Sequence, residues 1–145
     1  MTFTGDLSQM RALAGNVASL ARVPSRVAAR VSGELATLLD DEFSSGTDPY
    51  GTAWAPLAES TVARGRTAPP LTDTGAMRAG VTVRPMRAAG VAVFVPHPGA
   101  PHQTGWSGPQ GTGPARPILP AGGELPPEWA EVIEDATEQE FRRAI

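Results

Sequence analysis

Apolar residues four positions apart along one segment constrain the fold more than any other feature of this sequence. The residues at this spacing are Val27, Val31, Leu35, Leu39 and Phe43, with Leu38 alongside. The spacing places these side chains on one face of an α-helix, and such an apolar stripe must pack on another element. The chain therefore needs a long helix in its N-terminal half and a second layer that covers it.

A shorter helical pattern precedes this segment. Apolar residues three or four apart predict an amphipathic helix over 7–21, with Thr4 or Asp6 near its start. Pro24 ends or kinks this helix, and Ser25 can cap the long helix that follows.

A further helix is predicted at the C-terminus. Two prolines at 126–127 suit the first turn of a helix, where no amide hydrogen is needed. Glutamates occupy one side of this segment and apolar residues the other. The apolar positions are Trp129, Val132, Ile133, Ala136, Phe141 and Ile145.

The middle of the chain predicts a β-hairpin. Val81–Met86 and Val91–Val95 are rich in β-branched residues and flank the turn sequence RAAG, while Pro85 places the first strand at an edge or lies at the strand's own end. An isolated hairpin is marginally stable in water, so we expect a third or fourth strand. Residues 71–72, residues 118–119 or a neighbouring subunit could supply it.

Shorter signals predict turns and single helical turns. The sequence DPYG (Asp48–Gly51) suits a type I turn, with Asp, Pro and Gly at the favoured positions. Pro56 can begin a short helix through LAESTVAR, and Thr74 can cap one helical turn at GAMRA.

These elements predict one α+β domain over 1–145, of a size that can bury its own core. A small, mostly antiparallel sheet packs against the long N-terminal-half helix and the C-terminal helix, with the helix in 1–22 loosely attached. A glycine- and proline-rich loop spans 99–125. Its segment His102–Pro120 holds four glycines and four prolines, so we expect it to join neither a helix nor a central strand and to become ordered against other subunits.

Composition narrows the function classes. No cysteine is present, which excludes disulfides and thiolate metal sites, and no apolar run approaches the roughly 18 residues of a membrane span. The N-terminus lacks the basic-then-apolar pattern of a signal peptide, so we expect a protein that stays soluble in the cell that makes it. The net charge of −3 argues against broad attraction to nucleic acid.

Charge is unevenly distributed along the chain. Residues 1–43 carry a net charge of −1 and residues 44–123 carry +3, whereas residues 124–145 hold seven acidic residues and two arginines, for −5. The basic middle and the acidic tail could complement each other within one subunit or between neighbours.

No arrangement of residues predicts catalysis or a cofactor. His97 and His102 are the only histidines and have no carboxylate near them in sequence, whereas a metal site usually needs three or four ligands. No GxSxG elbow is present, and the chain has no lysine that could complete a phosphate-binding loop. The acidic run Asp40–Glu42 is interpreted as a solvated helix end. We therefore predict a protein that is not an enzyme and holds no metal or cofactor.

Two other function classes are also compatible with the sequence. A small nucleic-acid-associated protein could use the loop with Arg64 and Arg66, together with Arg84 and Arg87, although no aromatic residues interleave with these arginines. A hydrolase using one of the two histidines would need a pocket that gathers it with a carboxylate.

Four segments in a fixed order carry a family resemblance: DPYGTAWAPLAEST, LTDTGAMRAGVTV, PHQTG and GPARPILP. Together they resemble the phage virion-morphogenesis family, also called tail-completion proteins, over about residues 27–120. Met77 departs from the usual Leu, Ile118 from the usual Phe, and Gly99-Ala100-Pro101 from a usual Tyr-Ala. The residues that match the family pattern are Phe43, Asp48, Pro49, Gly51, Trp54, Leu57, Thr61, Leu71, Thr74, Gly75, Met77, Arg78, His102, Gln103, Gly105, Pro114, Ala115, Arg116, Pro117 and Leu119. The motif and interface candidates are these residues without Phe43, Leu71, Met77, Ala115 and Leu119, together with Trp106.

The resemblance implies a structural role at the head–tail junction of a tailed phage or phage-derived particle. Such proteins cap the finished tail or join it to the head connector, as rings that match the symmetry of the tail. The implied partners are other copies of the chain in a ring, expected to be hexameric, with the tail tube or terminator and the head connector. Phage DNA would pass through the lumen without specific binding, and no membrane would be involved. The protein would occupy the host cytoplasm during assembly and the virion afterwards.

A closed ring needs two different complementary surfaces on each subunit. The +3 and −5 segments could supply them, and we expect the glutamates of the last helix to face the lumen or a neighbour. Trp106 is predicted either to anchor an interface or to fold back on its own sheet. Arg116 is predicted to bond either a neighbour or its own loop's carbonyls. Trp54 is expected in the core.

Overall fold

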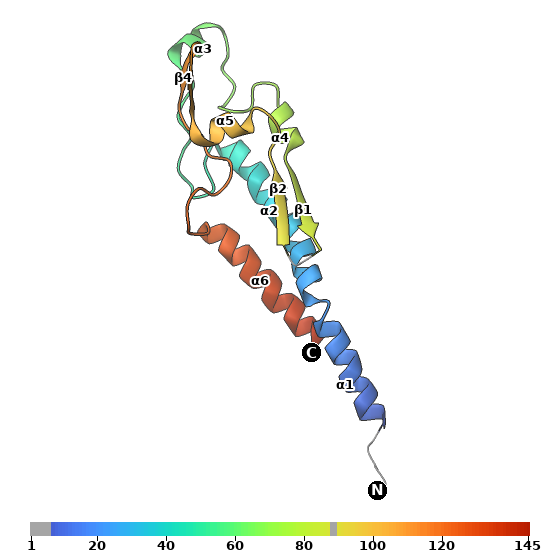
Figure 1. The fold of residues 1–145 in the computed structure, drawn as a ribbon. Helices are drawn as coiled ribbons and strands as arrows, with labels where there is room; N and C mark the ends of the chain where they lie inside the picture. Colours follow the sequence, from blue (N-terminus) through green and yellow to red (C-terminus); the bar gives the residue numbers. More distant parts are fainter. Residues whose placement is uncertain (1–6, 88–89) are drawn as a thin grey trace.

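The computed structural model describes residues 7–87 and 90–145 and has an α+β fold, as predicted (Figure 1). The expected helix start at Thr4 or Asp6 and residues 88–89 of the RAAG turn lie outside the described residues. The elements are α1 (Leu7–Leu20), α2 (Val23–Ser45), α3 (Glu59–Ala63), α4 (Ala76–Gly80), β1 (Thr82–Met86), β2 (Gly90–Phe94), α5 (Gly99–Thr104), β3 (Trp106–Gly108), β4 (Gly111–Gly113) and α6 (Pro127–Ala144).

Helix α2 is the centre of the fold, because both α6 and the β1–β2 hairpin pack against it. Its predicted stripe is buried from Val31 to Phe43, while Val27 and Leu38 are half-buried at its margin. The core cluster consists of Val31, Leu35, Leu39, Phe43, Trp54, Met77, Ile118, Trp129 and Ala136. The spacing of four therefore places the core correctly.

The predicted hairpin is present, with Thr82 opposite Phe94 and Val83 opposite Val93. Side chains alternate across a strand, so Val83 and Val93 face the core cluster and Thr82 and Phe94 lie on the other face. Among the described residues no third strand joins this sheet, so that prediction is wrong for the single chain. Leu71 has a φ of 65°, outside the extended region, and the amides at 118–119 bond a side chain instead.

The long loop is more ordered than predicted. Its start forms helix α5, and β3 and β4 form a second small antiparallel hairpin with Trp106 opposite Gly113. Gly111, with a φ of 120°, allows the tight reversal between these strands. Residues 99–125 are thus not wholly irregular, although each strand is only three residues long.

The first turn of α2 differs from the prediction. Helix α2 begins at Val23, so Pro24 lies in its first turn, and α1 ends before it at Leu20. Ser25 does not cap α2, because its hydroxyl donates to the carbonyl of Arg22 from within the helix.

Helix α3 also begins later than predicted, at Glu59 rather than Pro56. The carbonyl of Pro56 accepts a hydrogen bond from Arg116, which holds this residue outside the helix. The predicted cap of α4 is modified as well. Gly75, with a φ of 71°, is the N-cap, and the Thr74 hydroxyl accepts a hydrogen bond from the amide of Ala76.

Helix α6 buries a different side near its end from the one predicted. Phe141 is 51% exposed and Ile145 is 74% exposed, whereas Glu140 and Ala144 are buried. The buried positions Ala136, Glu140 and Ala144 continue the spacing of four, and Phe141 points away from it.

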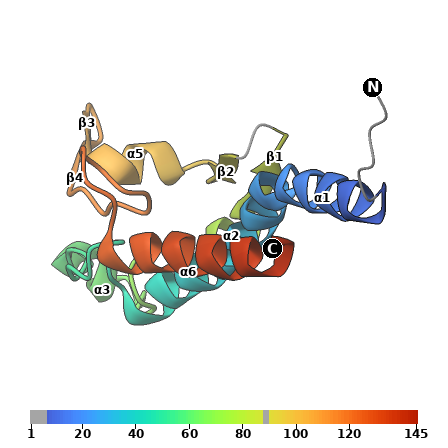
Figure 2. The same ribbon diagram turned by 90° about the horizontal axis from the view of Figure 1, so that it is seen from below.

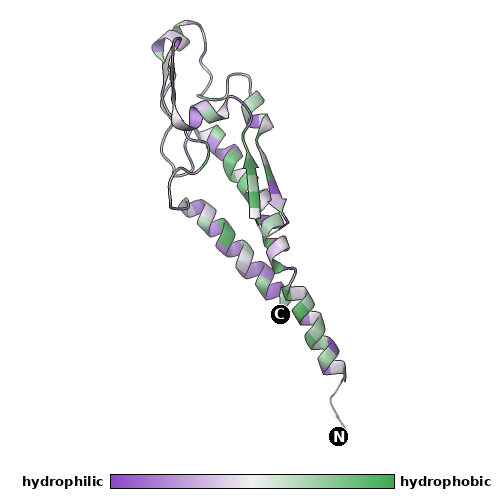
Figure 3. Ribbon diagram, in the orientation of Figure 1, coloured by the Kyte–Doolittle hydropathy of each residue, from purple (hydrophilic) through white to green (hydrophobic). Residues whose placement is uncertain are grey.

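Helix α1 projects from the rest of the chain, beyond the C-terminal end of α6 (Figures 1 and 2). It has no buried residue, and its ribbon carries both hydrophobic and hydrophilic residues (Figure 3). Among the residues that the structure describes, no helix combines the length and hydropathy needed to cross a membrane. The exposed members of the apolar stripe of α1 are Leu7, Met10, Leu13 and Val17.

Candidate functional site

The DPYG turn follows α2 directly and fixes the direction of the chain. The amide of Gly51 donates to the carbonyl of Asp48, and the side chain of Asp48 accepts from the amides of Tyr50 and Thr52. Gly51 has a φ of 83°, which favours glycine. This turn leads the chain into Trp54.

Trp54 is buried, as expected, and joins two of the predicted motif segments. Its ring packs edge-to-face on Phe43, with centroids 5.5 Å apart. Its indole N–H donates to the carbonyl of Pro117 over 2.7 Å. The DPYG segment and the PARPILP segment therefore meet at the end of α2.

Gln103 acts as a clip between α5 and the PARPILP segment. Its Oε1 accepts from the amides of Ile118 and Leu119, at 2.9 and 3.0 Å, and its Nε2 donates to the carbonyl of Leu119 at 2.7 Å. One amide side chain thereby satisfies both backbone amides and one carbonyl of the PARPILP segment.

Arg116 is buried, and its hydrogen bonds are internal. Its Nε donates to the carbonyl of Ala55 and its Nη2 to that of Pro56, both at 2.7 Å. Of the two predicted roles, these donors fit the internal one, although the carbonyls belong to the DPYG segment rather than to Arg116's own loop. Desolvation lowers the pKa of Arg116 from its usual value.

The remaining motif segment is fastened to α2 by Arg78. Its guanidinium forms an ion pair with Asp40 at 2.5 Å and a hydrogen bond to Ser44 at 2.8 Å. The pairing lowers the pKa of Asp40. Asp40 is thus engaged rather than simply solvated.

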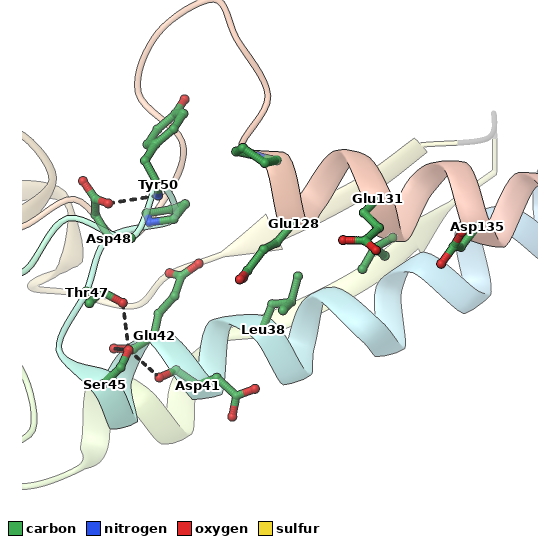
Figure 4. Close-up of a pocket in the computed structure, with 14 residues that line it drawn as sticks. Leu38, Asp41, Glu42, Ser45, Thr47, Asp48, Tyr50, Glu128, Glu131 and Asp135 are labelled. Carbon is green, nitrogen blue, oxygen red and sulfur yellow. Dashed lines mark hydrogen bonds between the residues drawn. The ribbon is translucent and has the colours of Figure 1, made fainter.

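An acidic cleft of about 680 Å³ opens between the C-terminal half of α2, the DPYG turn and α6 (Figure 4). Leu38, Tyr50 and Val132 are its larger apolar lining residues, and among the residues that the structure describes no basic one lines it. The acidic residues that line it are Asp41, Glu42, Asp48, Glu128, Glu131 and Asp135.

Glu42 is the unusual member of this cleft, because its side chain is buried and Oε2 has no hydrogen-bond partner. The side chains of Glu42 and Glu128 point toward one another (Figure 4). Burial raises the pKa of Glu42 to about 8, and repulsion from Asp48 and Glu128 adds to the rise. The nearby indole of Trp129 opposes the rise only partly, since its N–H makes no hydrogen bond of normal geometry.

The pKa of Glu42 predicts a stability change with pH. The folded protein keeps a proton that the unfolded chain releases above about pH 4.5, so wild-type stability should fall as pH rises toward 8. Glu42→Gln removes this ionisation and should gain on the order of 2 kcal/mol over wild type between pH 5 and pH 8, half or less of the full shift. Urea unfolding across this pH range measures the difference.

Glu131→Gln is the matched control, because it changes an exposed carboxylate of the same cleft. Parallel curves of unfolding free energy against pH for wild type and Glu42→Gln would contradict the account of Glu42.

A family model describing the phage virion morphogenesis family matches residues 6–142, nearly the whole chain. The chain belongs to the phage virion morphogenesis family. Comparison with curated proteins and with solved structures gives no significant match.

Membership of the phage virion morphogenesis family confirms the resemblance and indicates a role in building the virion. The matched region also includes α1 and most of α6, which lie outside the motif segments. Within this family member, the motif residues Trp54, Gln103 and Arg116 bind other parts of the same chain. They support the loops rather than present a reactive group.

The other motif positions also have structural roles. Gly105 has a φ of 77°, and a Cβ there would lie 2.9 Å from the carbonyl oxygen of Gly113. Leu57, just before α3, and Thr61, within α3, are half-buried, and Pro114 is exposed. Trp106 is 42% exposed and lies over Gly113, so it folds on its own small hairpin rather than on the main sheet.

The histidines do not form a catalytic arrangement in the part of the chain that is described. His97 is exposed, and His102 is half-buried with an unpartnered Nδ1. Burial and the nearby Arg116 lower the pKa of His102. No group of three metal-ligating side chains gathers among residues 7–87 and 90–145. In the arginine loop, Arg66 is engaged by Asp73 at 2.5 Å.

Sequence reasoning missed the acidic cleft and Glu42. The carboxylates of the cleft come from α2, the DPYG turn and α6, and α6 is far from the other two in sequence. The run Asp40–Glu42 was the only available signal, and its interpretation as a solvated end is wrong for Glu42, which the helical spacing turns inward between Leu39 and the DPYG turn.

Proposed function

We propose that the chain is a ring-forming subunit at the head–tail junction of a tailed phage or related particle, where it caps the tail or joins it to the head. Family membership supports a morphogenetic role, and the shape of the subunit supports assembly. The observation that carries the proposal is that one subunit exposes two unlike surfaces. One is the acidic cleft, and the other is the open face of the β1–β2 hairpin, with Arg84, Met86 and Phe94 exposed.

Two unlike surfaces suit head-to-tail association, which closes into a ring when the rotation between neighbours divides a full turn. The exposed apolar stripe of α1 provides additional area for contact with a neighbour or with the tail. An acidic α6 also suits a ring through which DNA must pass, because it does not attract phosphate.

Assembly without this protein tests the proposed function. Particles produced in its absence should accumulate as separate heads and tails, and adding the purified wild-type protein should restore joined particles. Joined, infectious particles at normal yield in its absence would contradict the head–tail role.

Trp106→Ala tests whether the small β3–β4 hairpin, which carries Trp106, is also a contact surface. Because Trp106 lies outside the core cluster, the variant should keep its unfolding free energy within about 1 kcal/mol of wild type. It should nevertheless impair ring formation or tail docking, since exposed tryptophans often anchor interfaces. Urea unfolding and light scattering measure the two effects, and loss of the folded monomer would count against the contact role.

A further inference from the structure

The acidic cleft has the features of a binding site for a cationic side chain. Glu42, a residue only 8% exposed, lines it, and the carboxylate oxygen Oε2 is buried there without a hydrogen-bond partner. An oxygen buried in this way is costly unless a donor reaches it. Glu128 points toward the same space from α6 (Figure 4).

The chemistry of the cleft favours a guanidinium. No three of its carboxylates are close enough together to hold a metal ion, among the residues described. Its acidic walls repel phosphate, which excludes a nucleic-acid backbone. An arginine offers five donors in a planar fork, and its apolar stem can pack on Leu38 and Val132.

The outer face of the β1–β2 hairpin presents a suitable arginine. Arg84 is exposed and forms no ion pair with any described residue. It shares its face of the sheet with Met86, 56% exposed, and with Phe94, 62% exposed. Nothing among the described elements covers these residues, so a cation stands here beside exposed apolar area.

The two surfaces lie on different parts of the subunit. The inner face of the hairpin packs on α2, whereas α2, the DPYG turn and α6 line the cleft, and no residue of β1 or β2 is among its lining residues. A contact between them within one chain would require rebuilding the core. A second copy can bring them together without any change of fold.

We propose that the hairpin of one copy docks on the acidic cleft of the next, with Arg84 donating to the carboxylates of Glu42 and Glu128. This inference deepens the proposed ring and rests on it. The cation stabilises Glu42 in its ionised form, and Met86 and Phe94 of one copy cover apolar surface around the cleft of the other. Each copy uses one hairpin and one cleft, as a head-to-tail contact requires.

A charge exchange tests this contact in the full-length protein. Arg84→Glu and Glu128→Arg change exposed side chains, so both variants should remain folded. Each should weaken self-association at least tenfold, and the double variant should recover most of it. Arg64→Glu is the matched control, an exposed arginine in the loop after α3. Association is measured by light scattering in solution and by co-sedimentation with purified tails.

The outcomes separate the contact from the ring itself. If wild type forms rings and Arg84→Glu forms them equally well, or if only Arg64→Glu weakens them, the docking is overturned and the ring proposal stands. Failure of the double variant to recover association would also overturn the pairing. A wild-type protein that remains monomeric both in solution and on tails would overturn the ring and the docking together.

Discussion

Gln103→Ala should lower the free energy of unfolding by about 3 kcal/mol, because it removes three hydrogen bonds at once. The amides of Ile118 and Leu119 would lose their acceptor, and Ile118 itself is only 1% exposed. An amide left unpaired next to a buried side chain costs more than the bond that it loses. The midpoint of urea unfolding measures this loss.

Two variants control this result. Gln103→Glu keeps an acceptor for both amides but loses the donor to Leu119, so its stability should fall between wild type and Gln103→Ala. Gln139→Ala removes an exposed glutamine of α6 and should leave the midpoint almost unchanged. Equal midpoints for Gln103→Ala and Gln139→Ala would show that the clip does not hold the PARPILP segment.

Arg116→Met should also destabilise the fold by about 3 kcal/mol. The side chain keeps a similar length, but the carbonyls of Ala55 and Pro56 lose two charge-assisted hydrogen bonds. Removing a buried charge recovers part of the desolvation cost, so the expected loss is smaller than the sum of the two bonds.

Arg64→Met is the matched control for Arg116→Met, because Arg64 is exposed. The control should unfold at the wild-type midpoint. A folded Arg116→Met as stable as this control, but unable to assemble, would reverse our interpretation and return Arg116 to an intersubunit role.

The helices and the core could be predicted from the sequence, because periodicity records which side of a helix is buried. The stripe from Val31 to Phe43 is long enough to define its own face. The end of α6 was predicted less well. Phe141 is apolar and Glu140 is not, yet the spacing continued from Ala136 buries Glu140. At these two positions residue type predicts that Phe141 is buried, whereas the helical spacing predicts that Glu140 is, and the structure follows the spacing.

The long loop shows what periodicity cannot record. The strands β3 and β4 are only three residues each and are rich in glycine, so they show no alternation to recognise. The hydrogen bonds at 118–119 depend on one side chain, because Gln103 Oε1 accepts from both amides, and no local pattern of the sequence records such a contact. Among the motif residues, Trp54 lies in the core as expected, and the hydrogen bonds of Gln103 and Arg116 go to other segments of the same chain.

The acidic cleft depends on tertiary structure alone. Only the packing of α6 against α2 brings Glu128 to Glu42, and the inward orientation of Glu42 follows from its place one turn past Leu38.

The number and position of copies in the purified particle test the central claim most directly. Quantitative mass spectrometry against a tail-tube protein gives the number, and electron microscopy of labelled particles gives the position. We predict a fixed number of copies that matches the rotational symmetry of the tail, located in a ring at its head-proximal end. Absence of the protein from finished particles, or a copy number unrelated to that symmetry, would contradict the account.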